Sequence, residues 1–193
     1  MTESKNKQSA KERILNAAEE LFYNEGIQSV GIDRIVKESH VALNTFYRYF
    51  TSKDKLIEAY LKNRDIKWMN WLNDFINQED EPIKKILLIF DALGQWFNED
   101  KYRGCAFINA SGELGSTKPF IYDISKMHKE NLYNEIYQIL TATNIEHEEK
   151  TAKKMMILTE GAIVQSYVIG DKEAATNAKE IAKSILKGIS NTD

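Results

Sequence analysis

Residues that interrupt helices or cross-link a chain are scarce in this sequence. It has one cysteine, two prolines and nine glycines among 193 residues. A lone cysteine excludes an internal disulfide framework, and the scarcity of proline and glycine favours a mostly helical chain. No segment approaches the roughly eighteen apolar residues of a membrane-spanning helix, and the polar N-terminus lacks the apolar core of a signal peptide. We therefore expect an all-α, cytoplasmic protein with no membrane partner.

A strong excess of basic residues is also missing. The net charge is −3, which argues against a chain that binds nucleic acid over its whole surface. Residues up to Arg64 carry 11 Lys and Arg against 9 Asp and Glu, whereas the remainder carries 15 against 20. Affinity for a polyanion would therefore come from a local cluster in the N-terminal third, doubled by dimerisation.

The most informative segment is Ser29–Lys53, with the sequence SVGIDRIVKESHVALNTFYRYFTSK. Ile32, Ile35 and Val36 have the spacing that buries one side of a helix, and Val41 lies in the turn that follows. This order of helix, short break and second helix is typical of a helix-turn-helix.

The second helix of this segment covers residues 43–50. Phe46 and Phe50 are four residues apart and point inward together, which leaves the remaining side chains at the surface. A helix that reads DNA needs short polar side chains for base edges and Tyr, Arg or Lys for phosphates, and this helix has both. On periodicity alone, the alternative is two ordinary helices of a bundle.

Caps and breakers predict the helix boundaries. Ser9 and Glu12 form a capping box, Gly26 ends the first helix, and Thr51 or Ser52 caps the fourth. Further helices are expected at about 83–98, 102–112, 119–142, 148–169 and 172–189, which gives about nine in all.

The run IDRIVKESHVALNT followed by FYRYFTSKDKLIEAYL resembles the DNA-binding domain of the TetR family of transcriptional regulators, with a match from about Ser9 to Arg64. The phrase GCAFINASGEL at 104–114 resembles the regulatory half of that family. The resemblance implies a three-helix DNA-binding domain at 9–64 and a ligand-binding and dimerisation domain at 65–193. It also implies a repressor that a small molecule releases from double-stranded operator DNA, with no cofactor, no metal and no enzymatic activity.

The resemblance also assigns roles to single residues. It implies that Thr45 and Tyr47 contact a phosphate or a base edge, that Tyr49 contacts phosphate or sugar, and that Lys53 pairs with a phosphate. Arg34 and Arg48 are further candidates.

This sequence departs from the family in the turn and at the start of the second helix. The family usually has Gly at the position of His40, Ser at Ala42 and often Gly at Asn44. We expect His40 to need a left-handed backbone, and Ala42 to cap the helix poorly. Because Asn can pair with adenine and Leu can contact a thymine methyl group, Leu43 and Asn44 are expected to give this chain its own sequence preference.

The last two predicted helices carry extensive apolar surface. The stripe in 172–189 consists of Ala174, Ala175, Ala178, Ile181, Ala182, Ile185, Leu186 and Ile189. The helix at 148–169 is apolar on more than one face, with Met155, Met156, Leu158, Ala162, Ile163 and Val164. A helix of this kind needs two partners, and a second subunit can be one of them. We expect a homodimer through residues 148–189 and an inverted-repeat operator; the alternative is one buried helix in a monomer.

Aromatic residues are dense in the middle of the chain, which favours an apolar cavity for a small, apolar or aromatic effector. The expected ligand-binding residues are Trp68, Trp71, Phe75, Trp96, Phe107, Asn109, Glu113, His128 and Gln165. The alternative is that the aromatic residues are core.

Cys105 suggests a second kind of signal. Lys101 and Arg103 are close in sequence, and basic neighbours favour the reactive thiolate. The alternative function is thus a repressor that senses oxidants or electrophiles through Cys105; otherwise the residue is a small buried apolar group.

Two other classes of protein remain as rivals. A small helical enzyme could use His128 with Glu130 or Glu135, or His147, although no catalytic motif accompanies them. A helical adaptor that binds only protein is the other.

Overall fold

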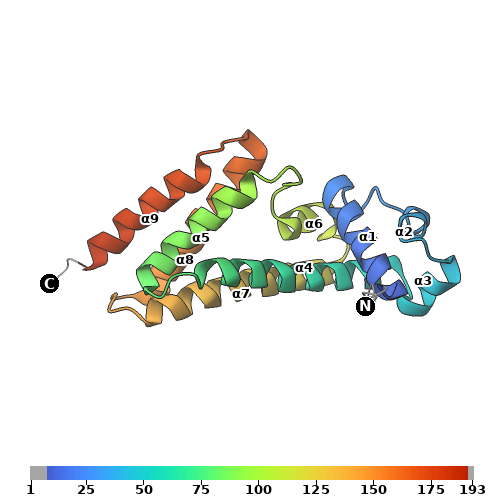
Figure 1. Cartoon of the computed structure of the whole chain (residues 1–193), viewed down its shortest axis with the longest axis horizontal. Coiled ribbons are helices and arrows are strands. Elements are labelled where there is room, and N and C mark those ends of the chain that lie inside the picture. Colours follow the sequence, from blue (N-terminus) through green and yellow to red (C-terminus); the bar gives the residue numbers. More distant parts are fainter. Residues whose placement is uncertain (1–7, 191–193) are drawn as a thin grey trace, which may run out of the picture. The chain divides into compact units, whose positions relative to one another are not determined.

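The computed structural model describes residues 8–190, and side chains up to Lys187 (Figure 1). In this range it has nine α-helices, one π-helix and no strand, so the prediction of an all-α fold with about nine helices is confirmed. The α-helices are α1 Ala10–Glu25, α2 Ile32–Glu38, α3 Leu43–Tyr49, α4 Lys53–Ile76, α5 Pro82–Phe97, α6 Ala106–Leu114, α7 Pro119–Thr141, α8 Glu148–Val164 and α9 Ala174–Ser190, and the π-helix η1 is Gln165–Ile169. None of these helices has the length and apolar character that a bilayer crossing requires.

The chain forms two compact units. The first unit comprises the chain up to Arg64 together with Ala106–Ile124, and the second comprises Asp65–Cys105 and the chain from Ser125. Helices α4 and α7 therefore each contribute residues to both units. Helix α6 belongs to the first unit, although it lies within the expected domain 65–193. The division into a DNA-binding domain and a ligand-binding domain stays a prediction.

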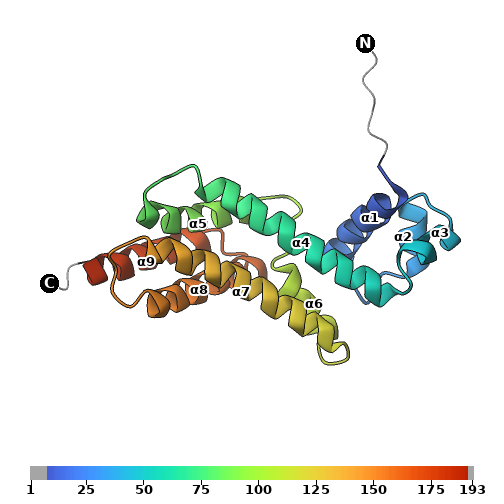
Figure 2. The same ribbon diagram turned by 90° about the horizontal axis from the view of Figure 1, so that it is seen from below.

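Helix α1 is fixed at both ends by its own sequence. Ser9 Oγ accepts a hydrogen bond from the Glu12 backbone N–H at 3.2 Å, and Glu12 Oε2 accepts one from the Ser9 N–H at 2.7 Å. At the other end Gly26 has a φ of 87°, which side chains rarely adopt. Figure 2 shows α1, α2 and α3 gathered beside the beginning of α4. The capping box expected from the sequence is present.

The core of the second unit depends on small residues of α9. Helix α9 packs against α5 and α8 and buries Ala175, Ala178 and Ala182 there. Since alanine lets helix backbones approach closely, the alanine stripe serves packing within the chain. Lys179 on α9 also forms a salt bridge with Asp91 on α5 at 2.5 Å, which adds to the packing of the two helices. The side chain of Ile189, the last residue of the expected stripe, lies outside the described part.

Two expected helix boundaries are wrong. The helix expected from residue 102 begins at Ala106, because Gly104 has a φ of 72° and interrupts it. The helix expected at 148–169 is α-helical only to Val164 and then widens into η1, which ends where Gly170 turns left-handed. At the fourth helix, Ser52 rather than Thr51 provides the cap, since Ser52 Oγ accepts from the Lys55 N–H at 3.2 Å.

Candidate nucleic-acid interface and ligand sites

The turn between α2 and α3 has the strained backbone that the sequence predicted. Ser39 Oγ donates a hydrogen bond to the Ile35 carbonyl at 2.7 Å and closes α2. His40 follows with a φ of 52°, in the left-handed region. Ala42 then starts α3 without a side-chain cap, and its carbonyl accepts from Thr45 N–H at 2.8 Å. Backbone bonds alone therefore hold the start of α3.

Helix α3 is oriented by two buried phenylalanines. Phe46 is 0% exposed and Phe50 is buried beside it, with ring centroids 6.1 Å apart. Their burial turns the rest of the helix outward, and Tyr47 is 46% exposed. The outward side chains are Leu43, Asn44, Tyr47, Arg48 and Tyr49, with Thr45 half-buried. Because Phe46 and Phe50 are buried, the large side chains on the opposite side of α3 stay exposed to solvent, which is typical of a contact surface.

Three cations were expected at this surface, and the structure gives each a neighbour. Arg48 lies over the Tyr49 ring at 5.2 Å from its centroid, and Arg34 forms an exposed salt bridge with Glu25 at 3.3 Å. Lys53 Nζ donates to the Ile27 carbonyl at 2.6 Å. Burial is the main cause of a lowered pKa for the Lys53 ammonium. In this structure Lys53 therefore joins α4 to the segment that follows α1.

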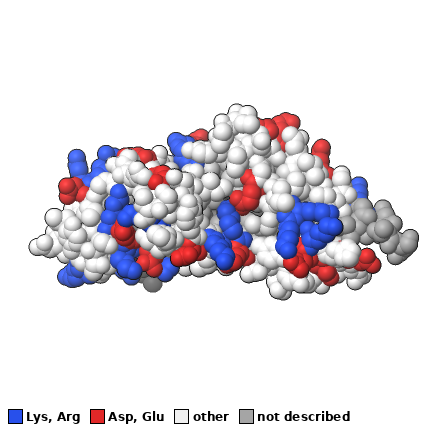
Figure 3. Space-filling view, turned by 180° about the vertical axis from the view of Figure 1, so that it is seen from behind, with Lys and Arg blue, Asp and Glu red and all other residues white. Residues whose placement is uncertain are grey.

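Charge is mixed on one face of the molecule. On the face shown in Figure 3, basic side chains lie beside acidic ones, and neither sign covers the face. On this face no broad basic field is present, and a local cation such as Arg48 of α3 is the alternative source of attraction to a polyanion.

The residues expected to bind a ligand divide into two groups. Phe107, Asn109 and Glu113 lie on α6 in the first unit. The Glu113 carboxylate accepts from the Gln28 backbone N–H at 3.0 Å, and its carbonyl accepts from Gln28 Nε2 at 2.5 Å. Lys118 pairs with Asp54 at 2.7 Å in the same unit. These contacts tie α6 to the DNA-binding helices, so Glu113 has a structural partner there.

The other expected ligand residues form an aromatic cluster in the second unit. The Trp68 ring centroid is 5.8 Å from that of Trp71, 5.9 Å from that of Trp96 and 5.3 Å from that of His128. Phe75 adjoins Trp71 at 6.5 Å. These rings pack on one another, and the buried Trp68 Nε1 has no hydrogen-bond partner among the described residues. Gln165 lies apart from them, exposed at the start of η1.

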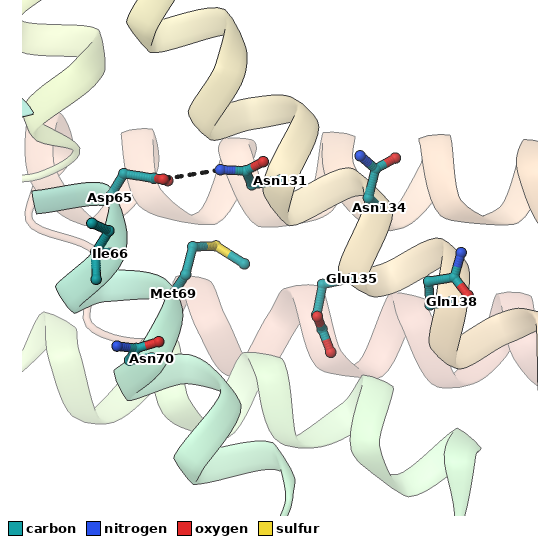
Figure 4. Close-up of a pocket in the computed structure, with 8 residues that line it drawn as sticks. All are labelled: Asp65, Ile66, Met69, Asn70, Asn131, Asn134, Glu135 and Gln138. Atoms are coloured by element: carbon teal, nitrogen blue, oxygen red, sulfur yellow. Dashed lines mark hydrogen bonds between the residues drawn. The ribbon is translucent and has the colours of Figure 1, made fainter. Parts of the chain in front are cut away.

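A polar groove between α4 and α7 was not anticipated (Figure 4). It has a volume of about 390 Å³ and is lined by Asp65, Ile66, Met69, Asn70, Asn131, Asn134, Glu135 and Gln138. Asp65 is buried in its wall, where Oδ1 accepts from His128 Nδ1 at 2.8 Å and Oδ2 accepts from Asn131 Nδ2 at 2.9 Å. The signal in the sequence is a polar face of α7 at i, i+3, i+4 and i+7, which ordinarily indicates only a solvated surface.

Cys105 is buried and has a basic neighbour that its sequence context does not reveal. Lys129 Nζ lies 3.3 Å from Cys105 Sγ and donates to both Glu160 carboxylate oxygens at 2.8 Å. Burial is the largest influence on the pKa of Lys129 and lowers it, but the interactions with Cys105 and Glu160 together raise it above its usual value. The ammonium is thus held in its charged form beside the sulfur.

Two of the groups proposed for the rival enzyme have other partners. His128 is paired with Asp65, and Glu130 lies 3.6 Å from Lys126. His147 is exposed and left-handed at the start of α8. Among the described residues, no group of three His, Cys, Asp or Glu side chains could hold a metal ion.

The helix-turn-helix and the second unit have counterparts in known proteins. The family described as "Bacterial regulatory proteins, tetR family" matches residues 14–60, from α1 into α4. A TetR-family transcriptional regulator from Streptomyces coelicolor has a crystal structure that matches 94% of this chain and 96% of its own, with a TM-score of 0.85 and 26% identity. This chain belongs to the TetR family.

Other relatives agree along nearly the whole length. The HTH-type transcriptional regulator YjdC of Escherichia coli is 21% identical over 92% of this chain and 93% of its own. The reduced form of Escherichia coli NemR is 20% identical, covers 92% of this chain and 96% of its own, and has a TM-score of 0.83. As a TetR-family protein, the chain is a DNA-binding transcriptional regulator whose matched relatives are named as regulators rather than enzymes.

Proposed function

We propose that this TetR-family protein is a repressor that binds an inverted-repeat operator as a homodimer and leaves it when a small molecule binds the C-terminal region, 65–193. The observation that carries the proposal is the outward face of α3. Its Tyr47, Arg48 and Tyr49 are exposed around a buried Phe46, as a helix that docks in a major groove requires. Asn44 near the N-terminus of α3 can contact a base edge, and the tyrosines and Arg48 can contact phosphates.

Exposed apolar side chains near the C-terminus support dimerisation. Val168 is 72% exposed and Ile169 is 69% exposed, and Ile157, Val164 and Ile181 are exposed as well. A second copy that covers them would remove this apolar surface from water, and a twofold axis would bring the same side chains of both copies together. Two α3 helices related by that axis would read two half-sites in successive major grooves.

Control by a ligand requires that the ligand prefer the conformation that does not bind DNA. Helix α4 is suited to transmit this preference, since it begins beside the helix-turn-helix at Lys53 and carries Asp65 and Trp68 in the second unit. A ligand that shifts α4 would change the spacing of the two α3 helices.

Selection of bound genomic DNA would identify the operator, and a double substitution would then test the dimer. Val168→Lys with Ile169→Lys places two charges in the proposed interface, so we expect a monomer in sedimentation and at least about a tenfold loss of operator affinity. Gln95→Lys, on an exposed position of α5, is the matched control and should remain a dimer. A dimeric double variant with unchanged affinity would contradict the proposal.

The contact of Lys129 with Cys105 favours a second candidate, a regulator that senses electrophiles or oxidants. Lys129 Nζ lies 3.3 Å from Cys105 Sγ, and a nearby cation favours the thiolate, the form of cysteine that reacts with electrophiles. Addition of the sulfur to the C=C bond of a maleimide forms an S–C bond as the C=C π bond breaks, and the neighbouring carbon takes up a proton from water. Cys105→Ser should then abolish release of DNA by an electrophile such as N-ethylmaleimide. If release persists in that variant, this candidate fails.

A further inference from the structure

The groove between α4 and α7 carries negative charge and no positive charge in its lining. Its eight lining residues include two carboxylates and four carboxamides, with no Lys or Arg. Such a surface repels phosphate and carboxylate ligands and attracts cations. Figure 4 shows that these side chains come from facing stretches of the two helices, with Asp65 directed toward Asn131 and Met69 directed toward the space between the helices.

The two carboxylates differ in how they are engaged. Asp65 already accepts from His128 and Asn131. Glu135 is half-buried and forms no hydrogen bond or ion pair with any other residue in the described part of the chain. Glu135 is therefore the charge that remains for a ligand, and its partial burial strengthens an ionic contact relative to open water.

The remaining lining decides what kind of cation fits. A divalent metal ion prefers a cage of several oxygen ligands, and no cluster of three acidic, His or Cys side chains occurs among the described residues. Asn70, Asn134 and Gln138 instead offer carboxamide oxygens to several N–H donors, while Ile66 and Met69 offer apolar surface to methylene groups. These features match an organic cation with more than one N–H donor and an aliphatic segment.

We propose that the α4–α7 groove binds an aliphatic diamine or polyamine, with an ammonium paired to Glu135, and that this cation is the effector. The inference rests on the proposed function, because it names the ligand class that controls the repressor. It names a cation in place of the apolar ligand expected from the tryptophans, whose rings contact one another. A cation in the groove would also compete for Asp65, the residue by which α4 is bonded to α7.

Binding to the full-length protein can be measured by calorimetry with putrescine and spermidine as probes. Butanediol has the same chain as putrescine without charge, and succinate has the opposite charge. We expect saturable binding of at least one amine and none of butanediol or succinate. Glu135→Gln should weaken amine binding by about tenfold or more. Glu130→Gln removes the same charge from the same helix outside the groove and should leave the affinity unchanged.

Two results would overturn the inference: neither amine binds saturably, or the two variants weaken binding equally, as a general field effect would. Release of the operator by amines is measured separately for the wild type and Glu135→Gln. The difference between the two proteins is the relevant quantity, because polyamines also bind DNA directly. If amines bind through Glu135 but do not release the operator, the groove is an amine site and ligand control by it fails. If another small molecule releases the operator and neither amine binds, the repressor proposal holds and the groove inference fails.

Discussion

The surface of α3 and the α4–α7 groove are both polar, yet they differ in the sign of the charge they present. In its seven residues α3 carries Arg48 and no acidic side chain, whereas the groove carries Asp65 and Glu135 and no basic one. Phosphate and ammonium are both strongly hydrated ions that form hydrogen bonds, so polarity alone does not distinguish their sites. The sign of a few local charges distinguishes the two sites, because the net charge of the chain is only −3.

The two surfaces also differ in what supports them. The buried side chains of Phe46 and Phe50 orient α3, so a local hydrophobic pattern determines which face of the helix is exposed. The groove depends on two helices from distant parts of the sequence, bonded to each other through Asp65 and Asn131. A local change should therefore affect one surface and spare the other.

The largest expected effect comes from Phe46→Ala. It leaves a cavity under α3, so the free energy of unfolding of the first unit should fall by about 3–5 kcal/mol and DNA binding should be lost. All three tryptophans lie between residues 68 and 96, in the second unit. Denaturation followed by tryptophan fluorescence should keep its midpoint, while circular dichroism should show an earlier transition.

Phe90→Ala provides the matched control in the second unit, where Phe90 is fully buried. It should shift the fluorescence transition. If Phe46→Ala shifts that transition just as far, the two units do not unfold separately and the comparison between them fails.

A smaller effect is expected when single charges are removed from the two surfaces. Arg48→Ala should weaken operator binding by about 1.5–3 kcal/mol and reduce the salt dependence of binding by about one counterion per protomer, because a phosphate contact is lost. Fluorescence anisotropy at several salt concentrations measures both quantities. In the absence of an amine, Glu135→Gln should change neither the operator affinity nor its salt dependence. Equal changes in the two variants would show that the electrostatic field of the whole protein, and not α3, attracts DNA.

The smallest effect is a gain. Ala42 starts α3 without a side-chain cap, so Ala42→Ser should stabilise the first unit by about 1 kcal/mol, through a hydrogen bond to a free backbone N–H. Chemical denaturation followed by circular dichroism would detect it. Ala59→Ser, within α4 of the same unit, provides no cap and should give no gain. An unchanged midpoint for Ala42→Ser would mean that α3 is held by its phenylalanines alone.

The sequence predicts the first surface well because its determinants are local. The spacing of Ile35, Phe46 and Phe50 identifies the buried face, and the three residues are buried in the structure. The left-handed turn at His40 also follows from a single position. DNA contacts of the outward residues, Lys53 included, stay predictions.

The second surface is not predictable in this way. The polar face of α7 from Asn131 to Gln138 has the pattern of any solvated helix, and only the tertiary structure places it opposite α4. The same holds for Lys129, which lies 24 residues from Cys105 along the chain and 3.3 Å from it in space. Tryptophan density fits a ligand cavity and a packed cluster equally, and in the structure the rings contact one another; ligand binding by these residues stays a prediction.

The most direct test of the account is a footprint of the wild-type protein on its selected operator, repeated with Tyr47→Ala. We predict two protected half-sites related by inverted symmetry, with centres about 34–36 Å apart, and loss of both when Tyr47 is replaced. A single unpaired protected site, or a footprint that Tyr47→Ala leaves unchanged, would contradict the claim that a pair of α3 helices reads the DNA.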